Sequence, residues 1–161
     1  MIDGIQLYLV VATALACGLM SGAFYAFSSF VMAGLGRLPS EQGIAAMQSI
    51  NVTAVRPGFM IGFFGTTLAC VAVAISAIVN WDQNISIWLL LGAGLYLIGV
   101  FVMTVAYHVP QNNKLAATSP TAKHAQEVWS RYLTEWTRWN HLRWISSLAA
   151  AAALTIAIRV V

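Results

Sequence analysis

Residues 57–79 read PGFMIGFFGTTLACVAVAISAIV, without a single charged side chain. A helix crosses the hydrocarbon core of a bilayer with ~20 consecutive apolar residues, so this run is long enough to span it. The composition of the whole chain agrees, because 60% of its residues are hydrophobic and 8% are charged. An average soluble domain has roughly 25% charged residues. We therefore predict an integral membrane protein whose main partner is the lipid bilayer.

Three further charge-free runs flank this one, over residues 4–36, 83–113 and 144–158. All four runs are continuously apolar, unlike the alternating strands of a membrane barrel. They predict four membrane-spanning helices, near Ile5–Gly34, Pro57–Val79, Ile85–Tyr107 and Asn140–Val160. The predicted fold class is an all-α membrane protein, a four-transmembrane-helix bundle in which residues 1–161 form a single domain.

The connection between the first two spans has a helical signal of its own. Ser40 is a residue that can cap free backbone N–H groups, and Glu41 suits the first turn of a helix. We predict a short interfacial helix over about Glu41–Thr53, ending near Asn51. Asn51 is then either a helix-end residue or part of a functional site.

The connection between the last two spans holds most of the polar residues. Pro110 and the Asn112-Asn113 pair predict a turn that ends the third helix. Ser119-Pro120 then predicts the start of a helix that runs from Thr121 into the fourth span, as a long cytoplasmic extension of it.

The basic residues predict the orientation of the chain. One side of the bundle holds seven of them: Arg37, Arg56, Lys114, Lys123, Arg131, Arg138 and Arg143. The other side holds only Arg159. Because basic residues concentrate on the cytoplasmic side, we expect both termini outside and the 37–56 and 108–141 loops in the cytoplasm, as in a bacterial inner membrane. Topology thus explains the net charge of +3, and no nucleic-acid-binding motif accompanies it.

Small residues recur at every fourth position in the first two spans. They are Ala14, Gly18, Gly22 and Ala26 in the first, and Gly58 and Gly62 in the second. Such stripes let helix backbones approach closely in lipid. We favour packing inside the bundle, and the alternative is a seam in a homo-oligomer or a membrane complex.

The long helix after Thr121 has two chemically different faces. At 100° per residue, one arc of ~100° collects Trp129, Tyr132, Trp136, Trp139, Asn140 and Arg143. Glu127, Arg131 and Arg138 fall on the opposite arc. An aromatic belt at the membrane interface explains the rings but not the asparagine and arginine among them. The aromatic face is therefore expected to cover a cavity.

Four segments of the chain carry a resemblance to a known family. They are GLMSGAF at 18–24, AMQSIN at 46–51, VPQNN at 109–113 and WTRWNHLR at 136–143. With them the chain resembles the anthrone oxygenase-like family of small integral membrane proteins. The resemblance implies four membrane helices and, for some members, oxidation of anthrones by molecular oxygen without a cofactor. His108 and Gln111 depart from the family pattern, which tends to have Asn and Leu there, and leave the substrate open.

The polar residues fit such chemistry, which requires a base, donors to an enolate or phenolate oxygen, and a dry aromatic pocket. Candidate catalytic residues are Asn112, Asn113 and Asn140 as donors, with Arg143 stabilising the charge. Candidate substrate-binding residues are Asn51, Tyr132, Trp136 and Trp139. Glu135 and His108 are both candidate bases, although Glu135 is better explained as an exposed partner of Arg131 or Arg138.

The first candidate function is a cofactor-independent oxygenase that acts on a lipophilic phenolic or anthrone-type small molecule. Other functions remain open beside it. His108, His124, His141 and Glu135 are metal-ligand types, but no two stand four residues apart on one face, so we expect no metal and no cofactor. The non-catalytic alternative is an accessory subunit or a carrier of lipophilic molecules in the membrane.

Overall fold

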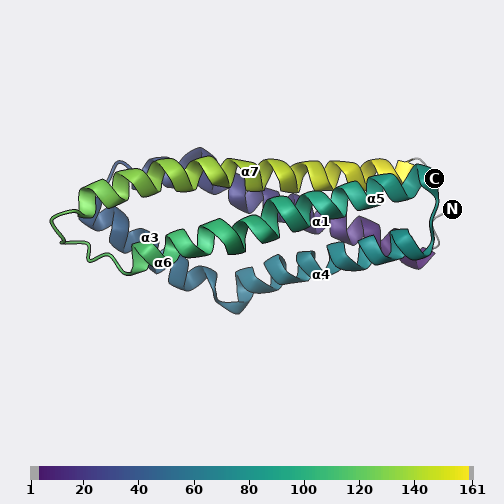
Figure 1. The fold of residues 1–161 in the computed structure, drawn as a ribbon, viewed down its shortest axis with the longest axis horizontal. Helices are drawn as coiled ribbons and strands as arrows, with labels where there is room; N and C mark the ends of the chain where they lie inside the picture. Colours follow the sequence, from purple (N-terminus) through teal and green to yellow (C-terminus); the bar gives the residue numbers. More distant parts are fainter. Residues whose placement is uncertain (1–3, 160–161) are drawn as a thin grey trace.

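The computed structural model describes residues 4–159, and these residues contain helices and no strand. The α-helices are α1 (Gly4–Ala26), α2 (Met32–Leu35), α3 (Ser40–Ala54), α4 (Pro57–Val79), α5 (Gln83–Tyr96), α6 (Val109–Ala116) and α7 (Ala125–Arg159). Three π-helical segments interrupt them: η1 (Phe27–Val31), η2 (Leu97–Val102) and η3 (Thr104–His108). The long helices lie side by side, with both ends of the chain at one end of the bundle and α3 and α6 at the other (Figure 1).

Four helical segments of the described chain are long and apolar enough to cross a membrane: Gly4–Leu35, Pro57–Val79, Gln83–Ala116 and Ala125–Arg159. Helix α1 packs against α4 and α7, and α5 packs against the same two helices, so the four spans form a closed ring. The predicted all-α four-helix membrane fold is therefore confirmed. The predicted end of the fourth span at Val160 lies outside the described residues.

Two hydrophobic clusters fill the bundle. The first lies between the four spans and includes Val10, Cys17, Cys70, Val73, Leu89, Tyr96 and Leu154. The second lies at the end that carries α3 and α6, and consists of Met32, Ile44, Met47, Leu115, Ala125, Trp129, Tyr132 and Trp136. Helix α7 contributes to both clusters, because its 35 residues extend well past the length needed to span a bilayer. The predicted long extension of the fourth helix is confirmed.

Close backbone approach occurs at glycines other than those of the predicted stripes. A Cβ on Gly99 would clash with the Ser146 side chain, and one on Gly43 would stand 2.7 Å from the Trp129 ring. Apart from the local backbone of the same helix, no atom lies within 4 Å of the corresponding point on Gly18, Gly22 or Gly58. The interpretation of the stripes as contacts inside the bundle is therefore wrong for these three glycines, whereas Ala14 belongs to the core.

The third span continues past its predicted end at Tyr107. It runs through η3 into α6, so Asn112 and Asn113 are helical and the turn comes only after Ala116. Pro110 is tolerated because it lies in the first turn of α6, directly after a π-helical segment. At this position no α-helical hydrogen bond requires the N–H that proline lacks. The prediction of a turn at Pro110 was therefore wrong.

Two further helix boundaries differ from expectation. Helix α7 begins at Ala125 instead of Thr121, because residues 119–124 form turns in which Ala122 N donates to Ser119 O and Ala125 N donates to Ala122 O. The predicted short helix is present as α3, but it continues to Ala54, past its predicted end near Asn51. Ser40 makes no capping bond, since the cap position is occupied by Pro39.

Candidate functional site

A cavity of about 570 Å³ lies where α3 and the start of α4 meet α1, η3, α6 and α7. Its walls are mostly apolar, with Phe24, Phe27, Met47, Ile50, Phe59, Met60 and Trp136 among them. The polar residues on the wall are few and come from different elements: Ser49, Asn51, Thr53, Arg56, Thr104, His108, Asn112 and Arg143. An apolar cavity with a small number of converging polar groups is the usual form of a small-molecule site.

Arg143 is the most unusual residue on this wall. Its side chain is only 6% exposed, and its guanidinium carbon lies 4.4 Å from the centre of the Phe24 ring and 5.1 Å from that of Trp136. Its polar partners are neutral: Nε and Nη2 donate to Asn140 Oδ1 at 3.2 and 2.7 Å, and Nη1 donates to Thr104 Oγ1 at 3.3 Å. Within residues 4–159 no carboxylate forms a salt bridge with it. The cavity wall therefore carries a buried positive charge without a counter-ion.

Asn140 fixes the position of this charge from behind the wall. It is completely buried, and its Nδ2 donates to Phe24 O and to Ser28 Oγ, both at 2.7 Å. Ser28 belongs to the π-helical segment η1, so a single side chain of α7 binds the irregular part of the first span. Its carbonyl oxygen is then oriented toward Arg143, which makes Asn140 a positioning residue for the guanidinium.

Asn112 of α6 is held by two aromatic donors from α7. Its Oδ1 accepts hydrogen bonds from Tyr132 Oη at 2.8 Å and from Trp136 Nε1 at 3.0 Å. The rings of Trp129, Tyr132 and Trp136 form a stacked series, with neighbouring centroids 5.8 and 6.1 Å apart. Because two donors already engage the carbonyl oxygen, the amide NH₂ is the end of Asn112 that can donate to a bound oxygen atom.

Two buried side-chain nitrogens on the cavity wall have no hydrogen-bond partner: Asn51 Nδ2 and His108 Nε2. Buried polar groups in native proteins nearly always have a partner, so an unpaired one on a cavity wall points to a missing ligand or water. His108 is only 1% exposed, and its ring packs edge-on against Trp136 with centroids 5.2 Å apart. The sequence predicted His108 as one of two candidate bases, and the structure places it on the cavity wall.

The predicted site residues thus separate into three groups. Asn51, Asn112, Trp136 and Arg143 line the cavity, whereas Tyr132 and Asn140 are buried directly behind it. Asn113 is exposed on the outside of α6. Trp139 is 39% exposed and packs against Tyr107, with ring centroids 5.2 Å apart. Neither of these last two residues lines the cavity.

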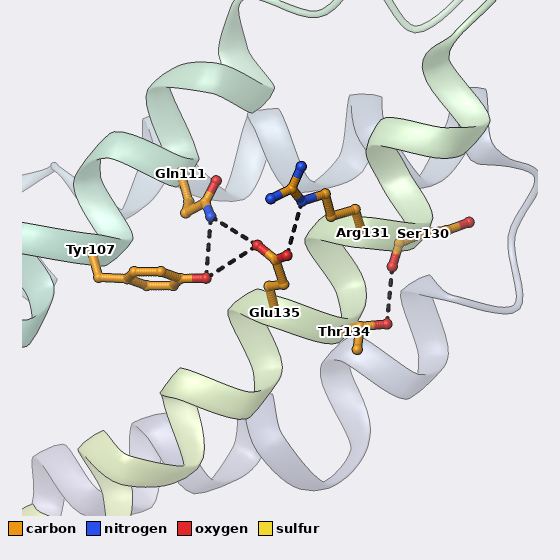
Figure 2. A network of polar contacts seen from close by, with 6 residues as sticks. All are labelled: Tyr107, Gln111, Ser130, Arg131, Thr134 and Glu135. Atoms are coloured by element: carbon orange, nitrogen blue, oxygen red, sulfur yellow. Dashed lines mark hydrogen bonds and ion pairs between the residues drawn. The ribbon is translucent and has the colours of Figure 1, made fainter.

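Glu135 belongs to a separate network on the outer face between α6 and α7 (Figure 2). Its Oε1 accepts from Arg131 Nε at 2.9 Å, as expected of an ion pair four residues apart on a helix. Its Oε2 accepts from Tyr107 Oη at 3.4 Å and from Gln111 Nε2 at 3.3 Å. The interpretation of Glu135 as the partner of Arg131 is confirmed. In the described part of the chain, no three His, Cys, Asp or Glu residues are grouped in a way that suits a metal ion.

Phe24 and Thr104, which the sequence analysis missed, come from the first and third spans, where they lie near or in the π-helical segments. Such segments are frequent at functional sites because they rotate the following side chains relative to a regular helix. The sequence offers only a weak signal for the two residues, since Phe24 ends the GLMSGAF segment and Thr104 lies outside the four segments that carry the resemblance.

The site is therefore suited to a flat, lipophilic molecule that carries or develops a negative charge. A sequence model described as anthrone oxygenase matches residues 59–153, more than half of the chain. No curated protein and no solved structure matches the chain.

Proposed function

We propose that this chain, which belongs to the anthrone oxygenase family, binds a lipophilic phenolic or anthrone-type compound in the cavity beside Arg143 and oxidises it with molecular oxygen, without a cofactor. The observation that carries the proposal is the buried guanidinium of Arg143, whose protein partners are all neutral. A buried charge is costly unless it is paired, so an anionic oxygen on the ligand would supply the missing partner.

The remaining walls suit the rest of such a ligand. Phe24 and Trp136 offer aromatic surfaces beside the cation, and Asn51 and Asn112 offer amide donors for a second oxygen atom. In a site that excludes water, hydrogen bonds to a developing oxyanion are stronger than in solution. Arg143, Asn112 and Asn51 are therefore proposed as the groups that stabilise the anion, with Asn140 and Tyr132 positioning them. Asn113 and Trp139 have no part in this proposal.

The cavity reaches the surface at a place that a lipid-soluble molecule can enter. Six of its lining residues are exposed: Ser49, Thr53, Val55, Arg56, Gly58 and Val109. Val55, Gly58 and Val109 are apolar, and Gly58 leaves open space at the start of a membrane-spanning helix. We propose that the substrate arrives through the membrane, and that this end of the bundle faces the cytoplasm because the basic residues concentrate there.

Replacing Asn140 by aspartate tests the proposal most directly. In Asn140→Asp a carboxylate would stand 2.7–3.2 Å from Arg143 and neutralise it within the protein. We expect the affinity for a hydroxyanthraquinone, bound as the phenolate, to fall ~10–100-fold, the size of a charge-assisted hydrogen bond. The affinity for unsubstituted anthraquinone, which is neutral, should change less than threefold. Equal losses for both ligands would contradict a site built around an anion.

Oxygen consumption separates the enzyme from the carrier. Metal-free protein in detergent should consume oxygen when given anthrone and release anthraquinone, and Asn140→Asp should lower the rate ~100-fold. Heat-denatured protein gives the background rate. Binding of anthrone without oxygen uptake would favour the alternative of an accessory subunit or a carrier of lipophilic molecules.

A further inference from the structure

We propose that His108, which stands where the family pattern tends to have Asn, is the catalytic base in the cavity of this chain, taking the proton from the acidic carbon of the substrate. The inference rests on the proposed function, because it names the residue that creates the anion which Arg143 stabilises. Three observations support it: the burial of the ring, the unpaired Nε2 atom, and the contact with Trp136, the same indole that Arg143 touches.

The backbone selects the tautomer in which Nε2 is a base. His108 Nδ1 lies 3.4 Å from the carbonyl oxygen of Met103, five residues earlier. A carbonyl oxygen only accepts hydrogen bonds, so Nδ1 is the protonated nitrogen of the neutral ring. Nε2 then carries the free lone pair. The separation of five residues is that of a π-helical turn, and η3 ends at His108. The irregular helix thus orients this ring.

The charged side chains around His108 favour its neutral form, so protonation of Nε2 requires an anion in the cavity. Among the charged side chains of the described residues, Arg143 of α7 shares the cavity with it, and Arg56, the residue before α4, lies at the exposed rim. No carboxylate lines the cavity, and Glu135 is engaged in its own network with Arg131 (Figure 2). A buried imidazole near a guanidinium favours its neutral form. Once the substrate has become an anion, it would lie between two cations, which stabilises the product of proton transfer.

The reaction balances with oxygen as the only co-reactant. Nε2 takes one proton from the methylene carbon of an anthrone, and the electron pair of the broken C–H bond spreads into the ring system and its oxygen. The carbanion reduces O₂ and joins it, which forms a C–O bond and a peroxide. The imidazolium returns its proton to the peroxide, and loss of water from the resulting hydroperoxide leaves the carbonyl. One anthrone and one O₂ thus give one anthraquinone and one water.

Hydrogen exchange without oxygen isolates the proposed step. Full-length protein in detergent is given anthrone in D₂O under anaerobic conditions, and deuterium entering the methylene group is followed by mass spectrometry. We expect wild type to accelerate exchange above the protein-free rate. His108→Asn should lose ~10²–10⁴-fold of that acceleration, the usual contribution of a general base. Its affinity for anthrone should change less than threefold.

Two controls make the result specific. Glu135→Gln removes the other candidate base and should exchange at the wild-type rate, because this residue does not line the cavity. His108→Gln provides a second amide in case His108→Asn does not fold, and thermal unfolding shows which variants are native. A merely structural role for His108 would lower affinity and melting temperature together with exchange.

The outcomes distinguish this inference from the proposed function. Unchanged exchange in a folded His108 variant, or loss of exchange in Glu135→Gln alone, overturns His108 as the base. Oxygen uptake by wild type without accelerated exchange also overturns it, and leaves the oxygenase proposal standing. Accelerated exchange that depends on His108 but brings no oxygen uptake supports the base and contradicts the oxygenase. Absence of anthrone binding overturns both.

Discussion

The guanidinium carbon of Arg143 lies 4.4 Å from the centre of the Phe24 ring, so the cation of α7 is covered by an aromatic face of the first span. The same two segments are joined again by Asn140, which donates to Phe24 O. This contact lies between the two hydrophobic clusters, where Phe24 belongs to one and Trp136 to the other. The guanidinium of Arg143 is therefore part of the packing that connects the membrane core of the bundle to its polar end.

Truncation of Arg143 should cost far more stability than truncation of an exposed arginine. Arg143→Ala leaves a void beside Phe24 and Trp136 and takes the donors from Asn140 Oδ1. We expect a loss of ~3 kcal/mol or more. Arg131→Ala should cost under ~1 kcal/mol, because the Arg131 side chain is 76% exposed. Thermal unfolding in the same detergent measures both, and equal small losses would place Arg143 outside the packed interior.

Gly43 should be indispensable for the seating of α3 on α7. A methyl group at this position would stand 2.7 Å from the Trp129 ring, so Gly43→Ala forces the two helices apart. We expect a loss of ~1–3 kcal/mol, the usual cost of overpacking, and weaker ligand binding, since α3 forms one wall of the cavity.

Gly94→Ala is the matched control for this change. Gly94 is also inside a helix, but no atom lies within 4 Å of its added methyl group. Alanine is a better helix former than glycine by up to ~1 kcal/mol in water, so stability should stay the same or rise. If both variants behaved alike, the close contact between Gly43 and Trp129 would not hold in the protein.

Filling the cavity should abolish binding without affecting the rest of the bundle. Ala54 lines the cavity, whereas Ala45 is exposed on the same helix. Ala54→Trp is expected to weaken hydroxyanthraquinone binding at least ~10-fold by occupying its space, and Ala45→Trp should leave it unchanged. Fluorescence titration of the ligand gives both affinities. Strong binding to folded Ala54→Trp would locate the ligand elsewhere.

Labelling with a membrane-impermeant thiol reagent tests the orientation. Ser119 and Gln83 are exposed at opposite ends of the bundle, and the native Cys17 and Cys70 are both buried. In intact cells Gln83→Cys should react and Ser119→Cys should react only after lysis, because the basic end faces the cytoplasm. The reverse pattern would invert the proposed topology.

The fold could be predicted from the sequence because its cause is local. Each span is a run of apolar residues, and lipid requires such a run to satisfy its backbone hydrogen bonds within one helix. The positions of α4 and α3 follow from Pro57 and Pro39, which mark helix starts. The end of the third span could not be predicted from the sequence. A proline normally ends a helix, but Pro110 follows the π-helical segment η3 and the span continues through α6.

The cavity could be predicted only in part. A regular helix places Trp136, Asn140 and Arg143 on one face of α7, and all three are buried as that periodicity indicates. Trp139 falls at the edge of the same arc and is exposed. Asn112 and Asn113 are adjacent and chemically identical, yet only Asn112 meets Tyr132 and Trp136.

Four membrane helices with a polar, aromatic end could be predicted from the sequence alone, because hydropathy and charge act residue by residue along one helix. Three relationships are visible only in the tertiary structure: Arg143 has no acidic partner among residues 4–159, Asn140 supports it from behind, and Nε2 of His108 lies unpaired on the same cavity wall. These relationships depend on which faces of separate helices meet. That is set by side-chain packing and by the changes of register in η1 and η3, which no single stretch of sequence specifies.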